Sequence, residues 1–285
     1  MERFTIRDFN AQYPTDDACL AAIFKNRYGT LRRCPACTKR TTFYRVRQRK
    51  CYACQHCGYQ LHPLADTIFH KSDTSLKSWF YAIYLFANSK NGVSAKELER
   101  QLGVTYKTAW RIAKQVRVLC HTPAHKLSQT VKIDDTCIGG ARPGKRGRGA
   151  EGKAVVVGAV QRGGRVAASV VGNLSADTVR PFIEKHIKPG TKLMTDEFTT
   201  YRTTRKGYSH RTINHSSGTY VRGQVHTNTI EGFWSQLKRS LSGTYHAVSP
   251  KHLQSYVNEF AYRYSKREWP VSLFFPMPAR AVRPA

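Results

Sequence analysis

Two closely spaced pairs of cysteines constrain the fold of this 285-residue chain more than any other feature. One Cys-x-x-Cys pair is Cys34 and Cys37, and a second, Cys54 and Cys57, follows after sixteen intervening residues. Such spacing is typical of four thiolates that hold one zinc ion, and metal binding would supply the folding energy that so small a module lacks. The alternating segment 41–49 between the pairs predicts a strand. We therefore expect a zinc ribbon that binds Zn²⁺.

Other residues near the pairs leave alternatives open. The cysteines could be free thiols without a metal, Cys51 is a spare thiol, and His56 and His62 are less regular candidate ligands.

The charge balance points to a polyanionic partner. Lysine and arginine number 47 against 18 acidic residues, a formal charge of +29, which exceeds what solubility requires. A basic ribosome-binding protein is the alternative. The residues between the cysteine pairs that we expect to contact DNA phosphates are Arg45, Arg47, Arg49 and Lys50. The other interpretation of these residues is a solvated face.

A helix-turn-helix is predicted after the ribbon. Residues 75–87 read as an apolar helix, and Ser94 with Glu97 forms a capping box for the next helix. Gly103 stands where the turn between two helices is expected. The residues of the following helix that we expect to face a DNA groove are Thr105, Tyr106, Lys107 and Arg111. A helical hairpin without a DNA role is the alternative.

A mixed α/β domain is predicted from residue 126 to residue 268. Apolar runs at 131–140, 153–160, 165–171 and 191–195 predict strands, and 175–187, the segment from 228, and 250–268 predict helices. The basic loop 142–152 contributes Lys145, Arg146 and Arg148 as further expected DNA contacts. The full division is 1–70 lead-in and ribbon, 71–125 helix-turn-helix, 126–268 α/β domain and 269–285 a tail, since prolines recur there.

Acidic residues are scarce in this chain, so an acid that lies beside an apolar run is a candidate for a functional role. Asp134 lies within a predicted strand, Asp196 ends another, and Glu231 shares a helix face with Lys238. Three converging carboxylates would form an oxygen-ligand site for Mg²⁺, and two such ions promote in-line attack on a phosphodiester. Lys238 would stabilise charge on the phosphate.

Each acid also has a structural interpretation. Asp134 or Asp135 could begin a turn, Asp196 could cap the segment after it, and Glu231 could form a capping box with Asn228.

Several longer motifs together resemble one family. The two cysteine pairs, Ala65-Asp-Thr-Ile-Phe-His-Lys-Ser72, Val131-Lys-Ile-Asp-Asp-Thr-Cys-Ile-Gly-Gly140, Thr195-Asp-Glu-Phe-Thr-Thr-Tyr201 and His226-Thr-Asn-Thr-Ile-Glu-Gly-Phe-Trp-Ser-Gln-Leu-Lys-Arg239 resemble the ISXO-like insertion-sequence transposases, a DDE group. The resemblance extends from about residue 10 to residue 265. Asp135-Thr-Cys137 departs from the Glu-Thr-Tyr expected there.

The resemblance implies a ribonuclease-H-like domain, Mg²⁺ or Mn²⁺ ions, and cut-and-join transposition of DNA by an oligomer. It implies that Asp134 and Asp196 are the first two acids. The third is Glu231 or Asn228, with Lys238 as the following base, because family members carry Asn or His as well as Glu at that place.

Two rivals remain open: a DNA-binding regulator with an inactive catalytic domain, and a metal-dependent nuclease that does not join strands. Because the sequence has no membrane span and no secretory signal, we expect a cytoplasmic, nucleoid-associated protein.

Overall fold

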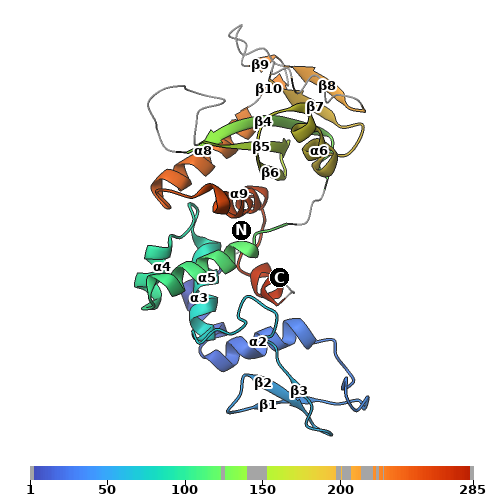
Figure 1. The fold of residues 1–285 in the computed structure, drawn as a ribbon. Coiled ribbons are helices and arrows are strands. Elements are labelled where there is room, and N and C mark those ends of the chain that lie inside the picture. Colours follow the sequence, from blue (N-terminus) through green and yellow to red (C-terminus); the bar gives the residue numbers. More distant parts are fainter. Residues whose placement is uncertain are drawn as a thin grey trace. The chain divides into compact units, whose positions relative to one another are not determined.

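The computed structural model describes residues 3–122, 126–139, 153–196, 200, 207–212, 221–222, 225–226 and 228–282. The chain forms two compact units, shown as ribbons in Figure 1. The first combines residues 1–89, 93–119 and 269–285, and the second combines residues 90–92 and 120–268. None of the described helices is long and apolar enough to span a bilayer.

The first unit joins a small sheet to a group of helices. Its elements are α1 (Ile6–Gln12), α2 (Asp16–Tyr28), β1 (Phe43–Val46), β2 (Cys51–Cys54), β3 (Gln60–Leu61), α3 (Leu76–Asn88), α4 (Ala95–Leu102), α5 (Tyr106–Val118) and α10 (Pro276–Ala281). Strand β2 lies between β1 and β3, antiparallel to both. The carboxylate of Asp16 accepts hydrogen bonds from the first two amides of α3, at 3.0 and 2.9 Å, and so ties α2 to that helix.

Helices α4 and α5 follow each other with a short turn between them, at the place where the sequence predicts two helices. The Ser94 hydroxyl accepts a hydrogen bond from the amide of Glu97 at 3.1 Å, as an N-cap should. Gly103 follows α4 with φ of 63°, a left-handed conformation that glycine adopts without steric cost. Thr105 then caps α5.

The segment expected to be a tail has a different structure. Two of its prolines, Pro276 and Pro278, occupy the first turn of α10, where the missing amide hydrogen costs no helical hydrogen bond. Phe274 is fully buried and stacks on Phe4, with ring centroids 4.7 Å apart. Residues 269–282 are therefore a packed part of the first unit.

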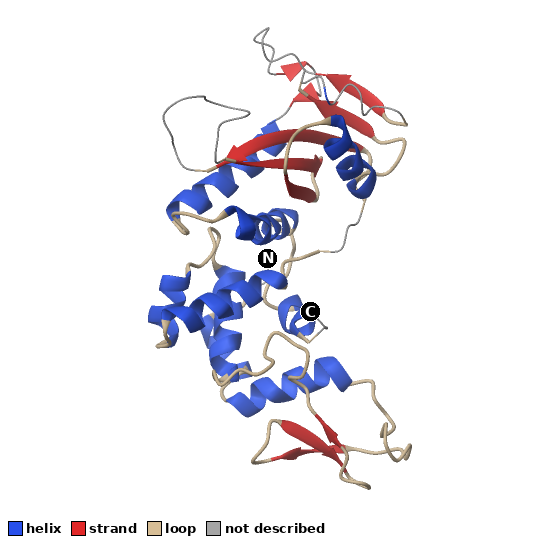
Figure 2. Cartoon of the chain, in the orientation of Figure 1, coloured by secondary structure: helices blue, strands red, loops and turns tan. Residues whose placement is uncertain are grey.

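The second unit is a mixed sheet with helices on both faces (Figure 2). Its elements are β4 (Thr130–Ile138), β5 (Ala154–Gln161), β6 (Val166–Val171), α6 (Ala176–His186), β7 (Lys192–Thr195), β8 (Ser209–Thr212), β9 (Val221–Arg222), β10 (Val225–His226), α8 (Asn228–Gly243) and α9 (Pro250–Ser265). The described strands of the main sheet are ordered β6-β5-β4-β7-β8; β4 is antiparallel to β5 and parallel to β7. This confirms the expected mixed sheet flanked by helices.

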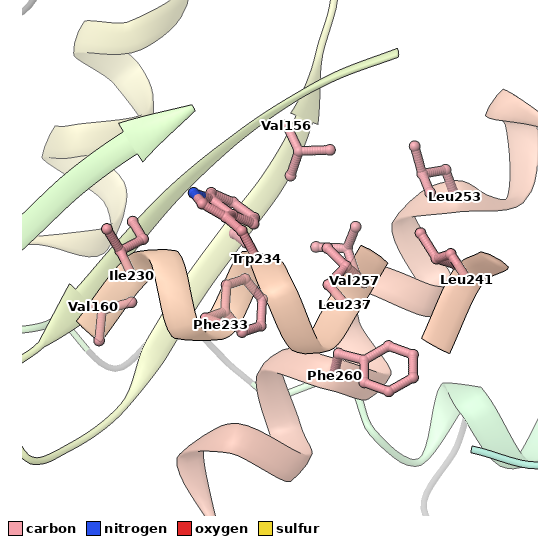
Figure 3. Close-up of a cluster of buried hydrophobic side chains, with 11 residues drawn as sticks. Val156, Val160, Ile230, Phe233, Trp234, Leu237, Leu241, Leu253, Val257 and Phe260 are labelled. Atoms are coloured by element: carbon pink, nitrogen blue, oxygen red, sulfur yellow. The ribbon is translucent and has the colours of Figure 1, made fainter. Parts of the chain in front are cut away.

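Alternation along β5 separates two cores. Val157 and Ala159 pack with α6, whereas Val156 and Val160 pack with α8 and α9. Figure 3 shows the second core, in which Phe233, Trp234 and Leu237 of α8 meet side chains of β5 and α9. Helix α8 is therefore held firmly against the sheet.

A buried ion pair strengthens α9. Arg263 donates to Glu259 Oε1 through Nε at 3.0 Å and Nη2 at 2.8 Å, and the Glu259 side chain is fully buried. The hydroxyl of Tyr245 donates to the same carboxylate. Each buried charge thus depends on its partner.

We expect Glu259→Leu to lower the free energy of unfolding by about 3–5 kcal/mol, because it leaves the Arg263 guanidinium buried without its counter-charge. Urea unfolding followed by circular dichroism measures the change. Glu268→Gln is the matched control; it alters an ion pair with Arg267 in which Glu268 is 73% exposed, and should cost less than about 1 kcal/mol. Equal losses in both variants would contradict this account.

Candidate functional site

Four cysteine side chains converge at one end of the small sheet. Cys34, Cys37, Cys54 and Cys57 have their Sγ atoms within 4.8 Å of one another. The sulfurs of Cys34 and Cys57 lie 3.6 Å apart, and those of Cys37 and Cys54 lie 3.8 Å apart. A tetrahedral zinc with Zn–S bonds of about 2.3 Å has sulfur–sulfur edges of about 3.8 Å. The residues therefore fit Zn²⁺.

Nearby candidate ligands lie outside this group. Cys51 is buried in β2 and its thiol contacts Gln60 Oε1 at 3.5 Å, while His56 Nε2 lies 3.2 Å from the Arg40 carbonyl.

The proposed DNA contacts of the first unit fall into two groups. Arg47, Arg49 and Lys50 are exposed on the ribbon. Arg45 is instead held by Asp17, with Nη2–Oδ1 at 2.9 Å, and by the carbonyls of Val46 and Arg49. Its guanidinium thus has a structural role that the sequence did not reveal.

At the start of α5, the predicted DNA contacts Thr105, Tyr106 and Lys107 are exposed. Arg111 is half-buried and donates to the His70 carbonyl at 2.9 Å. Lys145, Arg146 and Arg148 lie outside the described residues.

In the second unit, Asp134 lies on β4 and Asp196 directly follows the adjacent strand β7. The parallel register of β4 and β7 pairs Lys132 with Met194, so its continuation by two residues sets Asp134 opposite Asp196. Asp134 also pairs with Gly158 of β5 and lies on the face that α8 covers. The sequence motif alone left open which of Asp134 and Asp135 faces this side.

The electrostatics of Asp134 reflect this crowding. Burial is the main reason that the pKa of its carboxyl is raised from 3.8 to about 6. The negative charges of Asp135 and Asp196 raise this pKa too, while hydrogen bonds from the Asp135 amide at 2.8 Å and from Trp234 Nε1 at 3.1 Å oppose the rise. A divalent cation would relieve this repulsion.

Helix α8 carries the other predicted residues. Glu231 lies in its first turn and Lys238 two turns later, and both are exposed. Asn228 is the first residue of the helix, and its side chain lies outside the described set.

Lys132 is a member of this region that sequence reasoning missed. It is 1% exposed, and its Nζ lies 3.3 Å from Thr229 Oγ1 of α8. Burial lowers its pKa to about 8, the charge of Arg162 acts in the same direction, and Glu231 opposes both. The available signal was its position two residues before Asp134 on the same strand, which places both side chains on one face.

The donor set suits Mg²⁺, whose usual protein ligands are carboxylate oxygens. Each Asp134 oxygen accepts one hydrogen bond and keeps capacity for a second partner. Among the described residues, only the four cysteines bring three or more ligand atoms within 4.8 Å, so Asp134, Asp196 and Glu231 are not gathered that tightly. Ligands shared by two ions about 4 Å apart can be more widely spaced than this.

Comparison with known proteins identifies the family. The ISXO2-like transposase domain matches residues 126–265, and the transposase zinc-ribbon domain matches residues 14–60. This chain belongs to the ISXO2-like transposase family. The family and the cysteine cluster together support Zn²⁺ in the ribbon.

Two relatives carry related names. An uncharacterized protein in transposable element ISH50 of Halobacterium salinarum is 27% identical over 252 residues, covering 81% of this chain and 84% of that protein. An uncharacterized transposase-like protein of Haemophilus influenzae is 30% identical over 100 residues, covering 35% and 80%.

Among solved structures, a chain of the simian T-cell lymphotropic virus intasome complex matches with a TM-score of 0.31 and 13% identity, over 64% of this chain and 65% of that one. A chain of the pre-cleavage Mos1 transpososome matches with a TM-score of 0.20 and 10% identity, over 70% and 76%. Scores this low carry no argument about the fold.

Metal analysis of the purified chain should find about one zinc per molecule. Cys37→Ser should remove it, because one thiolate of the tetrahedral set is lost. Cys51→Ala, whose sulfur lies outside the set, should keep it. Zinc retained in Cys37→Ser, or lost in Cys51→Ala, would contradict the ligand assignment.

Asp134→Asn should stabilise the chain near pH 8 when no divalent cation is added. Because the folded chain holds the Asp134 proton more tightly than the unfolded chain, the wild type loses stability as pH rises from about 4 to about 6. The penalty above that range is up to about 3 kcal/mol, at about 1.4 kcal/mol per pKa unit. Urea unfolding at both extremes measures it; a gain in stability of equal size at pH 4 and pH 8 would contradict this origin.

Proposed function

We propose that this chain is a DNA transposase that binds the ends of an insertion sequence and performs metal-dependent cleavage and strand transfer. The observation that supports the proposal is that Asp134 lies on the sheet face covered by α8, close enough to Asp196 for that charge to raise its pKa, within a domain of a DDE transposase family. Two neighbouring, half-buried carboxylates are costly for a regulator that needs only to bind DNA.

The sheet order supports a ribonuclease-H-like assignment. Three antiparallel strands in sequence are followed by a helix and two strands that join on the other side of β4, giving the order 3-2-1-4-5. In this arrangement Asp134 lies in the middle of the first strand, β4, and Asp196 directly follows the fourth strand, β7.

Asp134 and Asp196 would hold Mg²⁺ or Mn²⁺, with Glu231 or Asn228 of α8 as the third ligand. When bound, two such ions activate a water or 3′-hydroxyl and stabilise the leaving oxygen of a phosphodiester. Lys238, two turns along α8 from Glu231 on the same helix face, would balance charge on the DNA backbone.

The first unit would bind DNA. The exposed start of α5, with Tyr106 and Lys107, supports a helix-turn-helix role, and Arg47 and Arg49 extend the basic surface of the ribbon. A cavity of about 450 Å³ adds Lys50, His62, His70 and Lys71 as donors suited to phosphate oxygens. The net charge of +29 favours such a partner.

Asp134→Asn and Asp196→Asn should each reduce Mg²⁺-dependent cleavage of element-end DNA by more than about 100-fold, since loss of a direct ligand should exceed the cost of an outer-shell change. DNA binding should stay near wild type. Gel assays of nicking, strand joining and binding measure the three steps.

Asp177→Asn is the matched control, because Asp177 is exposed on α6, against the opposite face of the sheet. Cleavage retained by Asp134→Asn or Asp196→Asn would refute the assignment, and cleavage without strand joining by the wild type would favour a nuclease. Comparison of Glu231→Gln with Asn228→Ala identifies the third ligand.

A further inference from the structure

The carboxylate of Asp134 accepts hydrogen bonds from two sides. The indole Nε1 of Trp234 donates to Oδ2 at 3.1 Å, and the amide of Asp135 donates to Oδ1 at 2.8 Å. The first donor comes from α8 and the second from β4 itself. Both oxygens therefore have a fixed position relative to the sheet and the helix.

Any large apolar ring could fill the space that Trp234 occupies in the core, but only a ring with an N–H group could donate its hydrogen bond. Trp234 is 5% exposed and belongs to the core between α8, β5 and α9, and Figure 3 shows its ring nitrogen at the edge of that core. An indole N–H can only donate, and a buried one normally finds an acceptor. Here the acceptor is the acid that we place first in the metal site.

Gly158 provides the space for this contact. It pairs with Asp134 across β4 and β5, and a Cβ atom there would lie 2.6 Å from Cη2 and 2.7 Å from Cζ2 of Trp234. Its φ lies outside the left-handed region, so the backbone does not require glycine. The absent side chain instead lets the indole lie across β5 and reach the neighbouring strand.

We propose that Trp234 is a positioning residue that orients the Asp134 carboxylate for metal binding, and that Gly158 supplies the space this requires. This inference rests on the proposed function of Asp134. It assigns to Trp234 a role beyond the core packing that its helical spacing indicates.

The test measures metal affinity directly. The full-length, zinc-loaded chain without DNA is titrated with Mn²⁺ by isothermal titration calorimetry, comparing wild type with Trp234→Phe. Loss of the hydrogen bond should weaken Mn²⁺ binding about 10-fold or more, as loss of outer-shell support commonly does. Cleavage by this variant should need correspondingly more Mg²⁺ and recover most of its maximal rate at saturating metal.

Trp79→Phe is the matched control. Trp79 is also buried, and its Nε1 donates to Ser72 Oγ at 3.0 Å, within the first unit. This variant should leave Mn²⁺ affinity unchanged.

Two further variants separate positioning from packing. Replacement of Trp234 by 3-benzothienylalanine exchanges only the N–H for sulfur, so it should keep the fold and still weaken Mn²⁺ binding. Gly158→Ala should weaken Mn²⁺ binding in the wild type but have a smaller effect beside Trp234→Phe, whose shorter ring relieves the 2.6 Å approach.

Unchanged Mn²⁺ affinity in the benzothienyl variant would overturn the inference. If Asp134→Asn abolishes Mn²⁺ binding in that case, the proposed function stands and only the role of Trp234 fails. If Asp134→Asn keeps both Mn²⁺ binding and cleavage, the metal site itself is wrong and the role of Trp234 falls with it.

Discussion

The second unit places the carboxylate of Asp134 between its β-sheet and the helix α8 that covers this face of the sheet. An ionised acid loses hydration when a helix covers it, and hydrogen bonds must replace that hydration. For Asp134 the replacement comes from a backbone amide on one side and an indole on the other. The apolar contacts of α8 with β5 and α9 keep the indole in place, so the core and the acid stabilise one arrangement.

Chain topology determines which acids become neighbours. Parallel strands cannot be joined by a tight turn, and here β5, β6 and α6 intervene between β4 and β7. Within that connection, α6 covers one face of the sheet, and the chain then returns as β7 beside β4 in a defined register. Asp196 consequently lies close enough for its charge to raise the pKa of Asp134, although the two are remote in sequence.

Much of this architecture could be predicted from local patterns. Apolar runs with β-branched residues marked β4 to β7, and Ser94 with Gly103 marked the limits of α4, because caps and left-handed turns leave clear residue signatures. β8 escaped detection because its residues, Ser209 to Thr212, are polar and mostly exposed, so no alternation distinguishes them from a loop. α10 was missed because prolines usually end helices and here begin one.

The site was harder to predict because it depends on distant partners. A lysine in a strand is normally expected to point into solvent. Lys132 is instead buried beneath α8, because it packs against a helix that is distant in the sequence. Arg45 looked like a phosphate contact and instead pairs with Asp17 of α2. The acids were predicted from motif resemblance and composition, whereas coordinates were required to show that Asp134, Asp196 and Glu231 do not gather within 4.8 Å of one another.

The discontinuity of the first unit has a consequence for biosynthesis. Phe274 and Met277 fill a core that also contains Phe4 and Phe9, but they leave the ribosome only after the whole sheet unit has been made. The nascent ribbon and helices must therefore wait for their last packing partners. A transcript broken within the second unit would yield fragments whose first unit lacks the buried side chains of Phe274 and Met277.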